Sequence, residues 1–199
     1  MVVSLPAVPL PRRPLDPVVP VDRTRRWYEN ELGWATVPAR AEHPGAPVRL
    51  RVGDRFDVLE MPAEAGIAGL RHLAPASPVA VQGGRMRLLV AAGSANELPG
   101  LLDWLEWGAL TLDLTATGLG GVMEAPLPPR VGRPGTLQGA AVWLRPPEPG
   151  REVEASLPAL SAVGGGGGAP DLVRLVDTVA THCHRLRLRR VCAEPLALP

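Results

Sequence analysis

Residues 110–126 read LTLDLTATGLGGVMEAP, and this stretch says most about the fold and the site. Apolar residues alternate around Asp113, which is typical of a half-buried strand. Glycines at 118, 120 and 121 then predict a turn, and a second strand over 122–125 ends at Pro126. We therefore expect a hairpin with the Asp113 carboxylate on a strand beside a glycine turn. A carboxylate in that position is suited to holding a metal ion near a phosphate chain.

The composition is that of a single domain without a general attraction to polyanions. The chain has 199 residues, of which 46% are hydrophobic, enough for one core. The formal net charge is +1, so nucleic-acid binding would need a local basic patch. The sequence contains no lysine, and all 21 basic residues are arginine, which binds carboxylate and phosphate through paired hydrogen bonds.

The chain shows no pattern typical of secretion or membrane insertion. Two cysteines, Cys183 and Cys192, do not suggest a disulfide framework. No apolar run has the length of a membrane span, and the first residues lack the pattern of a signal peptide. We expect a cytoplasmic protein with no membrane partner.

Short strands and amphipathic helices alternate along the rest of the chain. Gly83 and Gly84 predict a tight turn between two strands. The order of elements predicts an α+β fold with a mixed central sheet and flanking helices. Helices are expected over 22–32, 62–73, 97–107 and 171–192, and strands over 34–38, 48–52, 55–61, 78–82, 85–92 and 140–144.

Four segments follow from this pattern. Residues 1–21 carry a proline at about every third position, which predicts either a polyproline II strap that binds a partner or a disordered tail. Residues 22–150 form the α+β domain. Residues 151–170 include five consecutive glycines and predict a flexible linker. Residues 171–199 predict a basic amphipathic helix and a tail, with Asp171 as N-cap and one apolar face that docks.

Several segments, taken in order, resemble the primase–polymerase domain of the archaeo-eukaryotic primase superfamily. The first helix with GWATVPAR resembles the family's opening helix and strand, and VGDRFDVLEMPAEAGIAGLRHL resembles its first acidic motif and the next helix. VQGGRMRLLV resembles the Gly-Gly-x-His strand. LDLTATGLGGVMEAPLPP and AAVWLRPPEP resemble the third motif and the closing Trp strand. The resemblance covers about residues 24–149 and implies an α+β fold around a nucleotide and metal site.

This chain lacks much of the catalytic set that the resemblance implies. The family's first motif has two metal-binding carboxylates two residues apart, and here these positions are Glu60 and Pro62. The phosphate-contacting histidine is matched by Met86. The third carboxylate is matched by Asp113, and Thr115 stands where an arginine is expected. Two carboxylates hold Mg²⁺ or Mn²⁺ at most weakly, whereas two-metal phosphoryl transfer needs more oxygen ligands. We expect no required cofactor.

The resemblance also places a candidate phosphate site at the turn between the strands. Backbone N–H groups and two guanidinium groups would hold the anion there, and the alternative is a plain turn with two solvated arginines. The residues of this candidate site are Gly83, Gly84, Arg85 and Arg87. Glu60 and Asp113 are the candidates for a weak single-metal site if their strands are adjacent. In the alternative, each of them pairs with an arginine. Asp57 falls on the opposite strand face from Glu60.

The basic end of the last helix is a second candidate contact for nucleic acid. Its arginines would track a phosphate backbone, or they would only complement the helix C-terminus. These residues are Arg185, Arg187, Arg189 and Arg190. A zinc site is not expected at the nearby histidines and cysteines, because side chains at adjacent helix positions diverge. The residues concerned are His182, Cys183, His184 and Cys192.

Together these patterns predict a non-catalytic protein that binds nucleotide or nucleic acid through a degenerate active-site cleft. One alternative is a protein-interaction or regulatory module that retains only the scaffold, with the proline-rich arm and the C-terminal helix as its contact surfaces. A second alternative is an active primase- or polymerase-type nucleotidyltransferase with an altered metal site.

Overall fold

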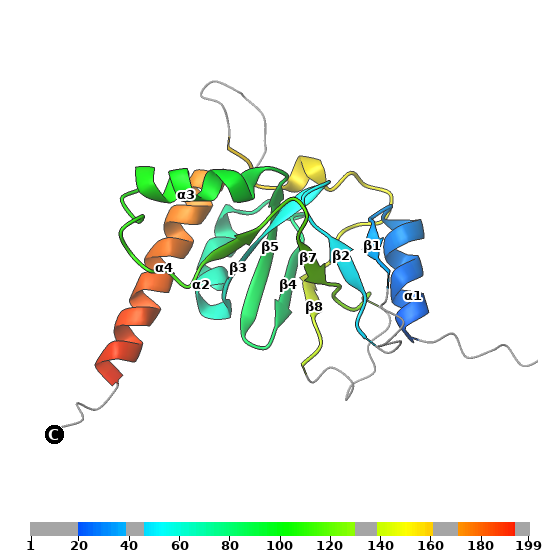
Figure 1. The fold of residues 1–199 in the computed structure, drawn as a ribbon, viewed down its shortest axis with the longest axis horizontal. Helices are drawn as coiled ribbons and strands as arrows, with labels where there is room; N and C mark the ends of the chain where they lie inside the picture. The colour runs from blue at the N-terminus through cyan, green and yellow to red at the C-terminus, as the bar shows by residue number, and fades with distance from the viewer. Residues whose placement is uncertain (1–19, 39–45, 130–138, 161–170, 194–199) are drawn as a thin grey trace, which may run out of the picture.

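The computed structural model describes residues 20–38, 46–129, 139–160 and 171–193. Within these ranges the chain forms two β-sheets and four α-helices (Figure 1). This confirms the predicted α+β class. Residues 1–19 of the predicted arm and the five glycines at 164–168 lie outside the described residues. In the described part of the chain, no helix combines the length and apolar composition needed to cross a membrane.

The larger sheet contains the strands β3 (Phe56–Pro62), β4 (Val79–Gln82), β5 (Arg85–Ala91), β6 (Thr115–Thr117) and β8 (Val142–Arg145). They lie in the order β6-β3-β5-β4-β8. At its centre β3 pairs with β5 from Phe56 opposite Ala91 to Pro62 opposite Arg85. Gly83 and Gly84 both have positive φ, which a two-residue hairpin turn requires, so the predicted hairpin of β4 and β5 is confirmed.

The smaller sheet contains β1 (Thr36–Val37), β2 (Arg49–Arg51) and β7 (Val122–Glu124), in the order β1-β2-β7. In the described residues, every ladder between named strands is antiparallel, so the prediction of one mixed sheet is wrong. The predicted hairpin of residues 110–126 is also wrong. β6 pairs with β3 while β7 pairs with β2, and the glycine turn carries the chain from one sheet to the other.

The helices are α1 (Pro20–Arg26), continued by the π-helix η1 (Trp27–Glu31), α2 (Ala63–Gly69), continued by the 3-10 turn η2 (Leu70–His72), α3 (Ser94–Trp104), the 3-10 turn η3 (Glu154–Ser156) and α4 (Leu172–Ala193). The starts of two helices, α1 and α3, differ from prediction by two or three residues. α1 begins at Pro20, before the expected cap Asp22. α3 begins three residues early because Asp57, on a distant strand, accepts a hydrogen bond from the Ala95 N–H at 2.8 Å and caps the helix.

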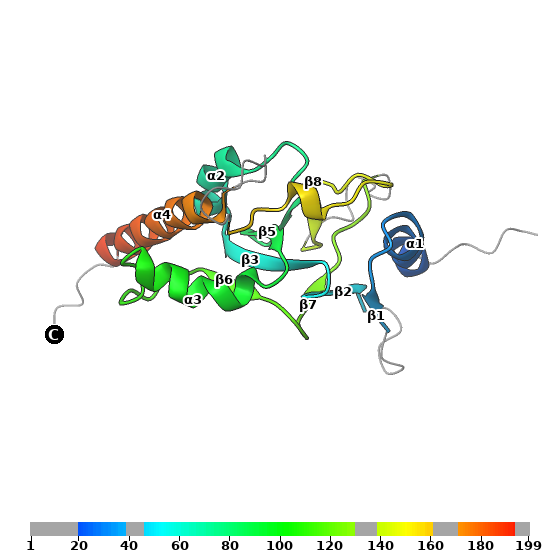
Figure 2. The ribbon, with the colours of Figure 1, turned by 90° about the horizontal axis from the view of Figure 1, so that it is seen from above.

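Two hydrophobic clusters lie on opposite faces of the larger sheet. Successive strand residues point to opposite faces, so β3 contributes to both clusters. Its residues Leu59 and Met61 pack with α2, α3 and α4. Phe56 and Val58 pack with the smaller sheet and with the aromatic residues near α1. Seen from above, α1 and α4 lie at opposite ends of the molecule (Figure 2).

The docking of the C-terminal helix is confirmed. Asp171 caps α4 by accepting hydrogen bonds from the N–H groups of Val173 at 2.9 Å and Arg174 at 3.4 Å. The apolar side of α4 is buried in the core, and each large side chain buried there stabilises the fold by about 1.5–3 kcal/mol. The buried residues of this stripe are Leu172, Leu175, Val176, Val179 and Cys183.

Substitutions at two glycines test how closely the backbone segments approach each other at the crossing between the two sheets. Gly53 has φ +102, and a Cβ there would lie 2.1 Å from the Leu119 Cα at the crossing between the sheets. We expect Gly53→Ala to destabilise the protein by about 2 kcal/mol or more, through strain and a backbone clash. Gly100 lies in α3, and a Cβ added there would have no other atom within 4 Å, so Gly100→Ala should stabilise by about 0.5–1 kcal/mol. Urea denaturation of both variants measures the two effects. Similar effects of both changes would contradict the close approach.

Candidate functional site

The register of β3 and β5 brings the predicted site residues together. Glu60 lies opposite Arg87 on β5 and opposite Thr115 on β6, while Pro62 lies opposite Arg85. Arg85 and Arg87 are two residues apart and so point to the same face of the sheet as Glu60. The predicted adjacency of the two arginines and the first carboxylate is therefore present on one sheet face.

Five side chains form a continuous line of ion pairs, which we call the arginine–carboxylate chain: Arg87, Glu60, Arg85, Asp113 and Arg190. Arg87 Nε lies 2.7 Å from Glu60 Oε2, and Arg85 Nε lies 3.2 Å from Glu60 Oε1. Arg85 Nη1 then reaches Asp113 Oδ1 at 2.6 Å, and Arg190 Nη1 approaches Asp113 Oδ2 at 3.8 Å. Positive and negative groups alternate along the line, and an arginine stands at each end.

Asp113 is not on a strand, so this part of the prediction is wrong. It lies in a bend two residues before β6. Extending the β3–β6 register would place it opposite Pro62, and proline has no N–H to continue the ladder. α4 holds the segment instead: Arg187 Nη1 donates to the Thr111 carbonyl at 2.6 Å, and Cys183 Sγ lies 3.5 Å from the Asp113 carbonyl oxygen.

The arginine–carboxylate chain is half-buried at its centre and exposed at one end. The side chain of Arg87 is 17% exposed, that of Glu60 30%, and that of Arg190 68%. Burial alone would raise the pKa of Glu60, but hydrogen bonds and charge from Arg87 and Arg85 outweigh burial and hold its pKa below the usual range. Burial would likewise lower the pKa of Arg85, yet Asp113 and Glu60 raise it. Both groups are thus held in their charged forms.

Arginines occupy the carboxylate oxygens that a metal ion would use. Both oxygens of Glu60 and both of Asp113 face guanidinium groups. A divalent ion would have to displace these groups and still find further oxygen ligands for its near-octahedral shell. Among the described residues there is no group of three or more side chains suited to metal binding. The predicted alternative, in which each carboxylate pairs with an arginine, is the arrangement in the structure.

Met86, at the position of the family's histidine, and Asp57, the acidic residue that precedes Glu60 on β3, face away from this site. Met86, at the place of the expected histidine, is 1% exposed and packs beneath α2, where a Cβ on Gly66 would lie 2.3 Å from its sulfur. Asp57 is buried on the same opposite face, as expected from alternation, and caps α3. Neither side chain can contact a ligand held between Glu60 and Arg85.

The predicted phosphate turn is exposed and fixed in place. Gly83 and Gly84 are exposed, and the Gly84 carbonyl accepts a hydrogen bond from the Ala63 N–H at 2.8 Å. Arg85 and Arg87, however, are bonded to carboxylates rather than solvated. Phosphate binding at this turn stays a prediction.

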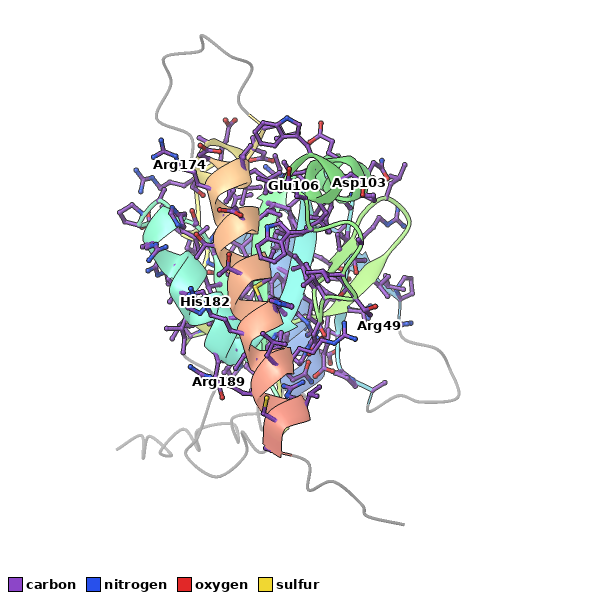
Figure 3. All side chains as sticks on the ribbon, turned by 90° about the vertical axis from the view of Figure 1, so that its left-hand side faces the viewer. Arg49, Asp103, Glu106, Arg174, His182 and Arg189 are labelled. Carbon is purple, nitrogen blue, oxygen red and sulfur yellow. The ribbon has the colours of Figure 1, made fainter. Side chains whose placement is uncertain are left out.

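The four predicted arginines of the C-terminal helix divide between two surfaces. Arg190 joins the arginine–carboxylate chain through Asp113, and Arg187 lies beside that chain, bonded to the Thr111 carbonyl. Arg185 and Arg189 line a cavity of about 230 Å³ with His182 and with Glu64 of α2. Figure 3 shows His182 and Arg189 on the side of α4 toward α2. The adjacent positions diverge as expected for a helix: Cys183 points into the core, where burial and then Asp113 raise its pKa to about 11. His184 packs near Trp107, with ring centroids 6.0 Å apart, and Cys192 is exposed.

Sequence reasoning missed two contributors to the site. Gln82 accepts a hydrogen bond from Arg87 Nη1 at 2.8 Å and donates to the Gly139 carbonyl at 3.0 Å. The two-residue turn places Gln82 opposite Arg85, so the hairpin itself was a signal for this residue. The role of Thr111, whose carbonyl anchors Arg187, has no local signal because it depends on how α4 docks.

Comparison of the chain with models of protein families, with curated proteins and with solved structures finds no match. The resemblance to the primase–polymerase domain therefore stays a prediction. Function has to be inferred from the geometry of the arginine–carboxylate chain.

The lowered pKa of Glu60 predicts a pH-dependent contribution to stability. Because the folded-state pKa lies below the unfolded value of about 4.3, the contribution is complete above that value and is lost as pH falls through the folded pKa. We expect Glu60→Gln to lower the free energy of unfolding by about 1 kcal/mol at pH 7. The difference in this free energy between the unmodified protein and the variant should decrease between about pH 5 and pH 3. Urea denaturation at several pH values measures the difference. Glu97→Gln, at an exposed position of α3, is the control. A difference in the free energy of unfolding that does not depend on pH would contradict the lowered pKa of Glu60.

Proposed function

We propose that the protein binds the phosphate groups of a nucleotide or a nucleic acid at the arginine–carboxylate chain, without catalysing phosphoryl transfer. The supporting observation is an excess of positive charge. Arg85, Arg87 and Arg190 lie along the chain and Arg187 adjoins it, against the two carboxylates of Glu60 and Asp113. Three cations paired with two anions, and Arg187 beside them, leave an excess of positive charge for a ligand.

A phosphate can bind at either end of the arginine–carboxylate chain without breaking its ion pairs. Arg87 and Arg190 each contact one carboxylate, whereas Arg85 lies between two. Guanidinium groups bind phosphate through paired, charge-assisted hydrogen bonds. The carboxylates and Gln82 already hold Arg87 in place, so less side-chain freedom is lost when a ligand binds.

The distribution of arginines favours a ligand with more than one phosphate. Arg87 lies on β5 in the sheet, and Arg190 lies near the end of α4. A single phosphate contacts one of these ends, whereas a polyphosphate or a nucleic-acid strand has charges at both. Counterion release at several contacts would make binding strongly dependent on salt.

The engaged carboxylates support a binding role over catalysis. Phosphoryl transfer by two metal ions needs oxygens free to fix both ions. Here a guanidinium group lies against each oxygen of Glu60 and Asp113. Arginine stays protonated and is a poor proton acceptor, so it supplies charge and orientation.

Binding of a fluorescent single-stranded oligonucleotide tests the proposal. We expect binding at low salt that weakens steeply as salt rises. Arg87→Ala and Arg190→Ala should each weaken binding uniformly across sequences and reduce the salt slope by about 1, because each removes a phosphate contact. Fluorescence anisotropy at several salt concentrations measures both quantities, with nucleoside triphosphates as competitors. Arg151→Ala, which removes an exposed arginine paired with Glu148, is the matched control. No binding at low salt, or equal loss in the control, would refute the proposal.

Glu60→Gln separates phosphate binding from metal-dependent transfer. Removing this carboxylate releases Arg85 and Arg87 from their ion pairs with Glu60 and makes the net charge more positive by one, so we expect the affinity for the oligonucleotide to rise several-fold. A metal-dependent transferase predicts the opposite, because Glu60 would hold the ion. The same anisotropy titration, with EDTA and then with Mg²⁺, distinguishes the two outcomes. Binding that needs Mg²⁺ and disappears in Glu60→Gln would favour the transferase.

A further inference from the structure

A groove beside α1 is separate from the phosphate site. It encloses about 560 Å³ and is lined in part by α1 and η1. α1 lies at the end of the molecule opposite α4 (Figure 1). Trp27 lines it together with prolines that follow β7 and β8, namely Pro128, Pro129, Pro146 and Pro147. The indole of Trp27 packs edge-on against the buried Tyr28 ring at 4.8 Å, which fixes its orientation.

This lining suits one kind of ligand. Proline has no N–H group, so a proline-lined groove cannot pair with a peptide as one strand pairs with the next. A polyproline II segment needs no such pairing, because its backbone is solvated and its rings pack against aromatic and proline surfaces. The groove therefore fits an extended, proline-rich peptide.

The chain carries such a peptide in the sequence that leads into α1. Its first twenty residues read MVVSLPAVPLPRRPLDPVVP, with prolines at 6, 9, 11 and 14 in the stretch 6–14. Every third residue of a polyproline II helix returns to the same edge, so in that conformation Pro6 and Pro9 share one edge and Pro11 and Pro14 share another. Position 20 is the first residue of α1, and Trp27 lies seven residues further along the same helical segment. We propose that residues 6–14 of this arm occupy the groove of the same molecule.

The arm is long enough to fold back. Seven residues of helix advance about 10 Å, which is the distance along the helical segment from position 20 to Trp27. The six residue steps from position 14 to position 20 span up to about 19 Å when extended. Because about 19 Å exceeds the distance of about 10 Å to Trp27, this part of the arm is long enough to reverse direction and to reach Trp27. Residues 6–14 then extend along the groove.

The groove offers carboxylate partners for the arginines of the same segment. That segment carries Arg12 and Arg13. The groove is lined by two carboxylates, Glu31 and Glu148, and by two arginines, Arg23 and Arg26, so its own formal charges balance. Both carboxylates are exposed, and Glu148 pairs only with Arg151 of its own loop among the described residues, at 2.7 Å. An arginine of the arm can therefore reach either carboxylate without breaking a buried interaction.

Trypsin cleavage of the Arg12–Arg13 bond in the full-length protein tests this docking. Tethering gives the arm a local concentration on the order of 1 mM, so a site with a dissociation constant of about 0.1 mM would be filled about 90% of the time. Cleavage of that bond should then be about tenfold slower than in a free peptide of residues 1–19, because proteolysis follows the undocked population. Release of residues 1–12 at early times, followed by mass spectrometry, measures the rate.

Two variants of the groove and their controls complete the experiment. Trp27→Ala removes the aromatic surface and Glu148→Arg reverses a surface charge; both should return cleavage toward the rate of the free peptide. Trp104→Ala, at a tryptophan that is 72% exposed on α3, and Glu97→Arg should keep the protection. Protection independent of protein concentration supports docking within one molecule. Cleavage as fast as in the free peptide, protection unchanged by both groove variants, or protection that grows with concentration and so reports a second copy, would each overturn the inference.

Discussion

The antiparallel pairing of β3 with β5 is the interaction on which the rest of the structure depends. It turns the odd-numbered residues of β3 toward α2, α3 and α4 and the even-numbered ones toward the aromatic cluster near α1. Along the second face, Phe56 and Val58 are covered by that cluster, whereas Glu60 lies beyond it and is half-exposed. The candidate site therefore lies at the end of β3 where apolar side chains no longer cover this face of the strand and arginines of β5 lie opposite it.

Local patterns were sufficient to predict the strands of this pair and their hairpin turn. β3 and β5 lie within about a residue of the predicted ranges, because alternation and the Gly83–Gly84 turn are signals contained in a few neighbouring residues. The early start of α3 was beyond such signals, since its cap comes from Asp57, thirty-eight positions away in sequence. Pairing of Glu60 with an arginine was one of the two alternatives left open, and the partner Arg87 could not be named because no short-range pattern sets the register of β3 against β5.

The segment 110–126 shows where the same reasoning fails. Its alternation and glycines indicate two strands and a turn, and both strands exist. Their partners depend on the whole fold: the first joins β3, the second joins β2, and Gly53 packs against the turn between them. The start of the first strand is set by Pro62, which cannot extend the ladder to Asp113. The strand is therefore shorter than its pattern, and Asp113 is free to turn toward Arg85 and α4.

The position of Arg85 links these features to the proposed function. Its guanidinium group lies between the Glu60 and Asp113 carboxylates, where a metal ion shared by the two would lie. The protein therefore supplies the cation of this site with its own side chain. A guanidinium group balances two carboxylates but has no exchangeable coordination position, and it cannot activate a nucleophile as a metal ion does. Such a site keeps its shape without added ions. The flanking arginines, Arg87 and Arg190, each pair with only one carboxylate and then provide the unbalanced charge that a phosphate ligand requires.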